Sequence, residues 1–271
     1  DLVYQVNPPY QQPVVAYPQN NMIAGAGTPL LNNQVSLVNY SLEASECLED
    51  LRVSSEAVII KTVEGLIMKD TSYNISTNSG GYQRNMFIAK KTNSSLTDQG
   101  GKSFTVNVKY IPRDANYANF IKEKNFTKRL FDISTVKNLG GIGYPSVNII
   151  NKENETLFGS VKQPNNCCCS EPDFQLTNNI NILKYRISTE GFQCSYCCCD
   201  SCCCAEYQTK YIIYNSNYQI VGDITKAELA NRREKLTYRI RFPLDATPED
   251  KIVLISSVII IDNFAHRAVG W

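Results

Sequence analysis

The residues of this chain best suited to chemistry are cysteines, and ten of the eleven lie in two short clusters. Adjacent cysteines are poorly placed to bond one another, because a disulfide needs a specific Cβ separation and torsion angle. The eleventh, Cys47, stands apart. An odd and unevenly spread set is unlike the framework of a secreted disulfide-rich domain, so we expect a reducing, cytosolic environment. The clusters consist of Cys167, Cys168, Cys169, Cys194, Cys197, Cys198, Cys199, Cys202, Cys203 and Cys204.

Three chemical states are open to these thiols. The leading hypothesis is S-acylation by palmitate, because two or more acyl chains turn marginal membrane binding into stable anchoring. The first alternative is zinc. The spacings Cys194-x-x-Cys197 and Cys199-x-x-Cys202 suit zinc ligands, but they overlap and leave little chain to wrap an ion. The second alternative is a set of unmodified, reduced thiols at the tip of a hairpin.

Composition excludes several other classes of function. The net charge is only +1, so no global positive field argues for a nucleic-acid partner. His266 is the single histidine, and nothing near it suggests a Ser-His-Asp or Cys-His centre. We therefore expect no bond-making or bond-breaking chemistry.

The first 33 residues differ in composition from the rest. They are rich in Pro, Gln and Asn and cannot bury enough apolar surface to offset the entropy lost on ordering, so we predict a flexible tail. A proline-recognition domain is a candidate partner, although neither PxxP nor PPxY is present, and a linker without a partner is the favoured alternative. We predict that residues 34–271 form one domain.

At four places a stretch of alternating apolar and polar residues, the pattern of a β-strand, leads into an Asn-rich turn. A second strand pattern follows each turn. Asn and Gly tolerate the positive φ of tight hairpin turns, so the pattern predicts four hairpins in series. Serial hairpins of this kind are most economically closed into an antiparallel barrel. The four hairpins begin at Tyr73, Val147, Phe174 and Tyr211, and two further strands begin at Phe104 and Leu236.

Three segments have helical patterns. Ser45 is a candidate cap for a short helix over residues 46–52, with acidic residues in its first turn. Residues 226–235 are helical in pattern; a solvated helix between two strands is the favoured interpretation, and contact with anionic headgroups is the alternative. The third segment, 251–264, contains ten uncharged residues between Lys251 and Asp262.

The apolar run at 251–264 is too short for a bilayer, which needs roughly 20 residues. A segment that is apolar on all sides but too short to span is better explained as a helix buried in a protein core; membrane insertion is the alternative. The predicted core residues are Ile252, Val253, Leu254, Ile255, Val258, Ile259, Ile260 and Ile261.

The order of these features resembles the phospholipid scramblases over about residues 50–271. The features are a Pro-rich tail, serial hairpins, cysteine clusters, Phe242-Pro243-Leu244-Asp245, an apolar terminal helix carrying an Asp, and a Gly-Trp end. The resemblance implies calcium-stimulated, ATP-independent movement of phospholipids between leaflets, and palmitoylated cysteines. It implies a location at the cytoplasmic face of a membrane, the plasma membrane above all. The related tubby-like proteins imply a mainly β fold, a closed barrel of about twelve antiparallel strands around a central hydrophobic C-terminal helix. The alternative function is a non-transporting, membrane-tethered adaptor or lipid-binding protein.

Two departures from the family pattern matter. The hairpin that carries the family's main acylated cysteines looks like residues 120–131 here, which contain no cysteine. The calcium segment is also altered: only Glu234, Thr237 and Asp245 offer side-chain oxygens, and Arg239 stands where the family has glycine. Calcium requires several oxygen ligands around a sharply turning loop. We therefore predict a barrel strand here, with weak or absent calcium binding.

Overall fold

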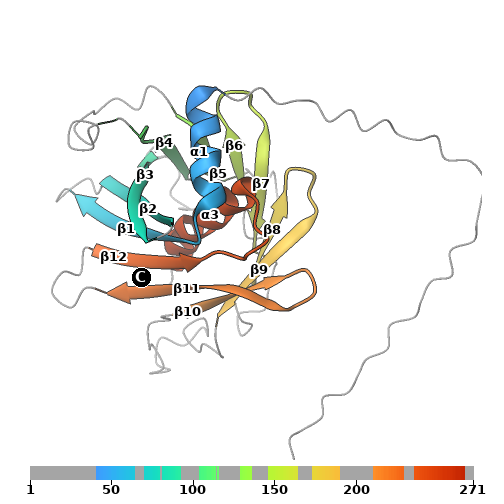
Figure 1. The fold of residues 1–271 in the computed structure, drawn as a ribbon. Helices are drawn as coiled ribbons and strands as arrows, with labels where there is room; N and C mark the ends of the chain where they lie inside the picture. Colours follow the sequence, from blue (N-terminus) through green and yellow to red (C-terminus); the bar gives the residue numbers. More distant parts are fainter. Residues whose placement is uncertain are drawn as a thin grey trace, which may run out of the picture. The chain divides into compact units, whose positions relative to one another are not determined.

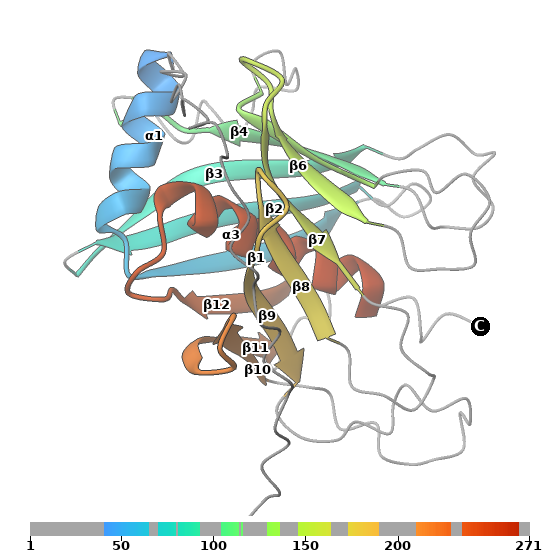
Figure 2. The ribbon, with the colours of Figure 1, turned by 90° about the vertical axis from the view of Figure 1, so that its right-hand side faces the viewer.

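The computed structural model describes residues 41–64, 70–79, 81–92, 104–113, 115, 129–135, 146–163, 173–189, 210–228 and 235–265. Both cysteine clusters, the predicted tail, Glu234 and His266 lie outside these residues. The described part forms a closed barrel of twelve antiparallel strands around helix α3, as the sequence predicts (Figures 1 and 2). A second helix, α1, precedes the first strand.

Every strand pairs with its neighbours in sequence, and β1 closes the barrel against β12. The strands are β1 Glu56–Glu64, β2 Asp70–Ser79, β3 Tyr82–Thr92, β4 Thr105–Tyr110, β5 Phe131–Thr135, β6 Val147–Asn151, β7 Leu157–Lys162, β8 Asp173–Asn178, β9 Leu183–Thr189, β10 Lys210–Asn215, β11 Ile220–Glu228 and β12 Lys235–Arg241. The helices are α1 Leu42–Val53 and α3 Pro248–Ala265.

Because neighbouring strands are antiparallel, successive connections alternate between the two ends of the barrel. We call the end where β1 and α3 begin the helix end. The opposite end, where β7 and β9 finish and β8 and β10 start, is the cysteine end, because those four strands border the segments that contain the two clusters.

The four predicted hairpins are present as β2–β3, β6–β7, β8–β9 and β10–β11. Their asparagines act mainly through side chains. The Asn that ends β8, Asn178, accepts hydrogen bonds through Oδ1 from the backbone N–H groups of Ile180 and Ile182, and Asn215 accepts in the same way from Asn217 and Gln219. Such side-chain turns fix the chain reversal locally.

The positive φ that we assigned to Asn or Gly falls partly on other residues. Asn181 has φ 59°, as predicted, but Glu155 at 53° and Tyr218 at 59° also adopt it. The Asn side-chain hydrogen bonds determine the path of each loop. That path requires a positive φ at Glu155 and Tyr218, although neither residue is Asn or Gly.

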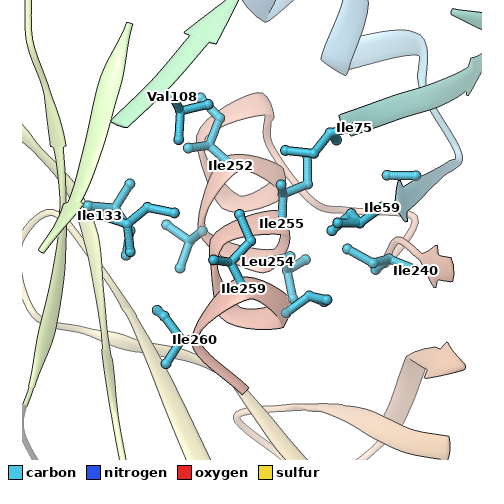
Figure 3. Close-up of a cluster of buried hydrophobic side chains, with 14 of the residues drawn as sticks. Ile59, Ile75, Val108, Ile133, Ile240, Ile252, Leu254, Ile255, Ile259 and Ile260 are labelled. Atoms are coloured by element: carbon cyan, nitrogen blue, oxygen red, sulfur yellow. The ribbon is translucent and has the colours of Figure 1, made fainter. Parts of the chain in front are cut away.

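Helix α3 runs through the barrel, and all eight of its predicted core residues are buried. Figure 3 shows several of them, among them Ile252, Leu254 and Ile259, facing apolar side chains of the strands. The helix begins at Pro248, three residues before the predicted start, because Thr247 and Asp250 form a reciprocal cap. Thr247 Oγ1 accepts from the Asp250 N–H at 3.2 Å, and Asp250 Oδ2 accepts from the Thr247 N–H at 3.2 Å. Proline suits the first helical position that follows.

The barrel wall approaches α3 most tightly at Gly159 on β7. A Cβ there would lie 2.8 Å from Val253 Cγ2 and 2.3 Å from the Thr177 carbonyl oxygen. Only glycine allows the helix and this strand to come so close. Neither helix of the described residues combines the length and the apolar character needed to cross a bilayer.

Two predicted helices differ from the structure. Helix α1 exists, but Ser41 caps it by accepting a hydrogen bond from the Ala44 N–H, and the predicted cap Ser45 lies inside the helix. The prediction of a helix over residues 226–235 is wrong at both ends of this segment. Lys226 belongs to β11 and Lys235 to β12, because strand pairing in the closed barrel overrides local helical propensity.

Candidate functional site

A buried carboxylate lies at the cysteine end of the barrel, on the last turns of the otherwise apolar α3. Asp262 is 1% exposed. Its Oδ2 accepts a hydrogen bond from Tyr73 Oη at 2.9 Å and forms an ion pair with Lys61 Nζ at 2.8 Å, and its Oδ1 accepts a hydrogen bond from Tyr238 Oη at 2.7 Å. The three donors come from β2, β1 and β12, the strands at which the barrel closes. A carboxylate in a protein interior needs such partners, since an unpaired buried charge is very costly.

The strand pattern explains why these donors meet Asp262. On β1 the inward-facing residues Ala57 and Ile59 are apolar, and Lys61, two residues further, lies on the same face. Lys61 pairs directly with Tyr73 on β2. In the same way Tyr238 on β12 pairs with Lys226 on β11. Each tyrosine that binds Asp262 is therefore opposite a lysine.

The charge of Asp262 and burial act together on the two tyrosines. Burial first, and then the Asp262 carboxylate, raise the pKa of Tyr73 well above its ordinary value, and the same causes raise the pKa of Tyr238. Both phenols consequently remain protonated and serve as hydrogen-bond donors at physiological pH.

Asn263 extends the network toward β3. Its Nδ2 donates to Tyr73 Oη at 3.1 Å and to the Ile259 carbonyl at 2.7 Å, and its Oδ1 accepts from Lys91 Nζ at 2.8 Å. We call the whole set the mouth cluster. Its members are Lys61, Tyr73, Lys91, Lys226, Tyr238, Asp262 and Asn263, which together contain three ammonium groups and one carboxylate.

The mouth cluster lacks the features of a catalytic or metal site. It contains no nucleophile beside a general base. Throughout the described residues, His, Cys, Asp and Glu side chains nowhere gather in groups of three that could hold a metal ion. The cluster can hold the end of α3 against the strands and present lysines at the barrel mouth, since all three lysines are partly exposed.

The helix end is built differently. Lys251, at the start of α3, is buried and its Nζ donates to the carbonyls of Leu51 at 2.8 Å, Arg52 at 3.2 Å and Ser54 at 2.8 Å. A cation suits the C-terminus of a helix, where carbonyls lack partners and the dipole is negative. This contact seats α1 over the end of the barrel where α3 begins (Figure 2).

Ion pairs also hold α1 against the barrel. Glu46 and Asp50, one helical turn apart, share the single hydroxyl proton of Tyr110, whose Oη lies 3.0 and 2.8 Å from their carboxylate oxygens. Arg84 and Arg113 pair with the same two carboxylates. Two acids thus meet two arginines, while Ala44, Cys47 and Leu51 of α1 pack into the core.

The cysteines are placed only through the strands that border them. The first cluster follows β7, which ends at Lys162, and precedes β8; the second follows β9, which ends at Thr189, and precedes β10. All four strand termini lie at the same end of the barrel as Asp262. The two clusters, separate in sequence, are therefore connected to one end of the fold.

Two of the three predicted calcium residues, Thr237 and Asp245, lie within the described part of the chain. Thr237 lies within β12, opposite Ile60, and Asp245 is exposed in the turn after β12, at the helix end. Residues 235–241 form the predicted strand. Arg239 pairs with Glu56, and Arg241 pairs with Asp223. Hydrogen bonds from Asn78 and Arg239 lower the pKa of Glu56, and those from Arg241 lower the pKa of Asp223.

Sequence reasoning missed Lys61, Tyr73, Tyr238 and the sealing role of Lys251. A signal was present, because an Asp in an apolar helix that is buried in a barrel requires inward-facing donors on the strands. The inward positions of β1, β2 and β12 include Lys61, Tyr73 and Tyr238 among apolar residues. Identifying the particular donors requires the register between β1, β2 and β12, which the sequence does not fix.

The model of the Scramblase family matches residues 127–267, which include β5–β12 and α3 and make up more than half of the chain. The chain belongs to the scramblase family. The match includes Lys226, Tyr238 and Asp262, whereas Lys61, Tyr73 and Lys91 precede it.

No curated protein sequence matches this scramblase-family chain. Two solved structures were found. One is a DUF1329 family protein from Desulfovibrio piger, with 7% identity, a TM-score of 0.24, and coverage of 75% of this chain and 93% of that one. The other is a putative outer membrane lipoprotein-sorting protein domain from Vibrio parahaemolyticus, with 9% identity, a TM-score of 0.23, and coverage of 78% and 96%. Similarity this low carries no argument about fold or function.

Proposed function

We propose that this protein moves phospholipids between the leaflets of a membrane without ATP, acting from the cytoplasmic face and principally at the plasma membrane. The observation that carries the proposal is the Scramblase family match over β5–β12 and α3. Such an activity relocates lipid without making or breaking covalent bonds, so the protein is a lipid translocator rather than an enzyme.

We propose that palmitate on the cysteine clusters anchors the protein. Two observations support this: the cysteines are adjacent, which disfavours mutual disulfides, and the strands that border both clusters end on one side of the barrel. Acyl chains attached at one end can enter the same bilayer together, and two chains give stable anchoring where one does not.

The filled barrel restricts how lipid could move. Residues 250–262 of α3 are buried along the barrel axis, and the helix packs directly on Gly159 of β7. A polar headgroup therefore has no room beside α3, and a lipid path would run along the outside of the barrel or through bilayer that the protein perturbs.

The filled interior also favours a second candidate, a membrane-tethered adaptor that transports no lipid. In that case the tail at 1–33 would recruit a partner such as a proline-recognition domain. Reconstitution separates the two functions. Purified protein is placed in vesicles with a fluorescent phospholipid, and quencher is added outside. Transport predicts loss of inner-leaflet signal beyond that of protein-free vesicles, without ATP. An adaptor leaves the inner-leaflet signal intact.

We further propose that calcium, if it acts, does so without a tight site at 234–245. Strand β12 directs successive side chains to opposite faces, so Thr237 cannot turn toward Asp245 to share an ion. Calorimetric titration should give at most millimolar affinity. Micromolar binding that disappears in Asp245→Asn would overturn this proposal.

A further inference from the structure

We propose that helix α1 is a detachable lid over the helix end of the barrel, and that Lys251 couples release of this lid to a loosening of the start of α3. The inference begins with what holds α1 in place. Its buried residues are Ala44, Cys47 and Leu51, of which only Leu51 has a large side chain. A helix of 12 residues is marginal without tertiary packing, so α1 depends on polar contacts for its position.

The polar contacts of α1 are ionic and partly open to solvent. Arg113, whose side chain is 57% exposed, donates to Asp50 Oδ1 from Nη2 at 2.5 Å and from Nε at 3.1 Å. Arg84, at 28% exposure, pairs with Asp50 and with Glu46. At the other end of the helix, the Ser41 N–H donates to a carboxylate oxygen in the β6–β7 turn at 3.1 Å. Salt screens exposed ion pairs, so it should weaken the hold on α1.

Lys251 provides the coupling, because it is a cation in an unfavourable position. It is the fourth residue of α3, close to the helix N-terminus, where the dipole disfavours positive charge. Burial lowers the pKa of Lys251, so the charged form is costly there. The carbonyls of Leu51, Arg52 and Ser54 offset this cost. When α1 leaves, the ammonium loses these three acceptors and must hydrate, which opens the first turn of α3.

The place of α1 in the chain makes the lid a regulatory device. In chain order α1 follows residues 1–40 and precedes β1, so it is the covalent link between that segment and the barrel. Coupling between two sites is reciprocal. A partner that binds residues 1–40 and requires α1 to be released therefore also loosens the start of α3. The inference needs neither lipid transport nor acylation and is independent of the proposed function.

Cys47 supplies a reporter of lid release, since it is fully buried on the face of α1 that packs into the core. Iodoacetamide treatment of the full chain, followed by mass spectrometry of the peptide that contains Cys47, follows this thiol separately from the other cysteines. We expect its alkylation to accelerate as sodium chloride rises from about 0.05 to about 0.5 M. Amide exchange in β7 and β11 should stay unchanged over the same range.

A matched pair of variants tests the ionic hold and the coupling. Arg113→Gln should accelerate alkylation of Cys47 up to about five-fold at low salt, reduce its salt dependence, and speed amide exchange in the first turn of α3, which Arg113 does not need to touch. The control, Arg241→Gln, removes an exposed arginine bound to Asp223 and should leave Cys47 unchanged. Lys251→Met should accelerate alkylation about ten-fold or more. Thermal unfolding checks that each variant folds.

Two results would overturn the lid. Alkylation of Cys47 that is no faster than exchange of the most protected strand amides, with the full denaturant dependence of global unfolding, would show that α1 opens only with the whole fold. Equal acceleration in Arg113→Gln and Arg241→Gln would show a general loss of stability. The coupling has its own contradiction: if Arg113→Gln exposes Cys47 but leaves exchange at the start of α3 unchanged, the role proposed for Lys251 is wrong.

Discussion

The two ends of this barrel differ in how the polar residues inside it are paired. At each end, polar residues lie inside the barrel beside the apolar layer around α3. At the helix end, Arg84, Lys251 and their neighbours are matched by the carboxylates and carbonyls of α1, and the end is sealed. At the cysteine end, Asp262 faces lysines on several strands. A closed barrel can therefore be apolar at its centre and still have two chemically distinct ends.

The largest effect should come from removing the anchor at the cysteine end. Replacing Cys197–Cys199 and Cys202–Cys204 with serine should move the cellular protein from the membrane fraction to the soluble fraction, because stable binding needs two acyl chains. Fractionation with acyl-exchange labelling measures this. Cys47→Ala, which alters the buried cysteine of α1, should leave partition unchanged. Retention of the serine variant at membranes, or stoichiometric zinc in the purified protein, would favour the other cysteine states.

The next largest effect concerns the buried charge on α3. Lys61→Met leaves Asp262 without its ammonium partner, and breaking a buried pair costs about 3–5 kcal/mol of unfolding free energy. Chemical denaturation of Lys61→Met, Asp262→Asn and the double variant completes a thermodynamic cycle. We expect the double variant to lose less than the sum of the single losses. Strictly additive losses would show that the two groups do not interact.

A smaller, local effect is expected at the helix end. Lys251→Met removes the ammonium that binds three carbonyls of α1 and its C-terminal turn. Hydrogen bonds to a charged group contribute about 1.5–3 kcal/mol, and we expect this loss to appear as faster amide exchange in α1. Strands at the cysteine end should keep their protection. Uniform acceleration through the barrel would mean that α1 is not a separate seal.

The smallest effect lies on the outer face of the barrel. Arg241 lowers the pKa of Asp223, so the pair stabilises the fold above the ordinary carboxyl range, and this stabilisation is lost as pH falls through the lowered pKa. Asp223→Asn should flatten the acid side of a stability–pH profile and leave partition to anionic vesicles unaltered. A profile identical to that of the wild type would show that the pair contributes nothing measurable.

Local periodicity predicted four of the hairpins and the buried terminal helix, whereas the closed barrel of about twelve strands was implied by the series of hairpins together with the family resemblance. Alternation gives the strands, and a run of ten uncharged residues is too short for a bilayer. The polar contacts of Asp262 could not be obtained this way. They join residues 24 and 189 positions apart along the chain and depend on barrel closure. Lys226 illustrates the same limit, since its segment had a helical pattern and only strand pairing directs it toward the mouth.

The helix end offers a rival membrane contact. Large apolar side chains are exposed on its turns, among them Ile182, Ile220 and Leu244, at 55%, 69% and 105% exposure. A protein bound by these tips would have the opposite orientation, with the mouth cluster away from lipid. The two orientations require protection at opposite ends of the same strands.

Amide hydrogen exchange with and without phosphatidylserine vesicles tests the orientation most directly, since it needs no substitution. If the cysteine end faces the membrane, vesicles should slow exchange near Thr62, Lys91, Thr189 and Lys210, and leave the β8–β9 and β10–β11 turns unchanged. Protection of those turns and of residues 242–247, with none at the cysteine end, would contradict the account.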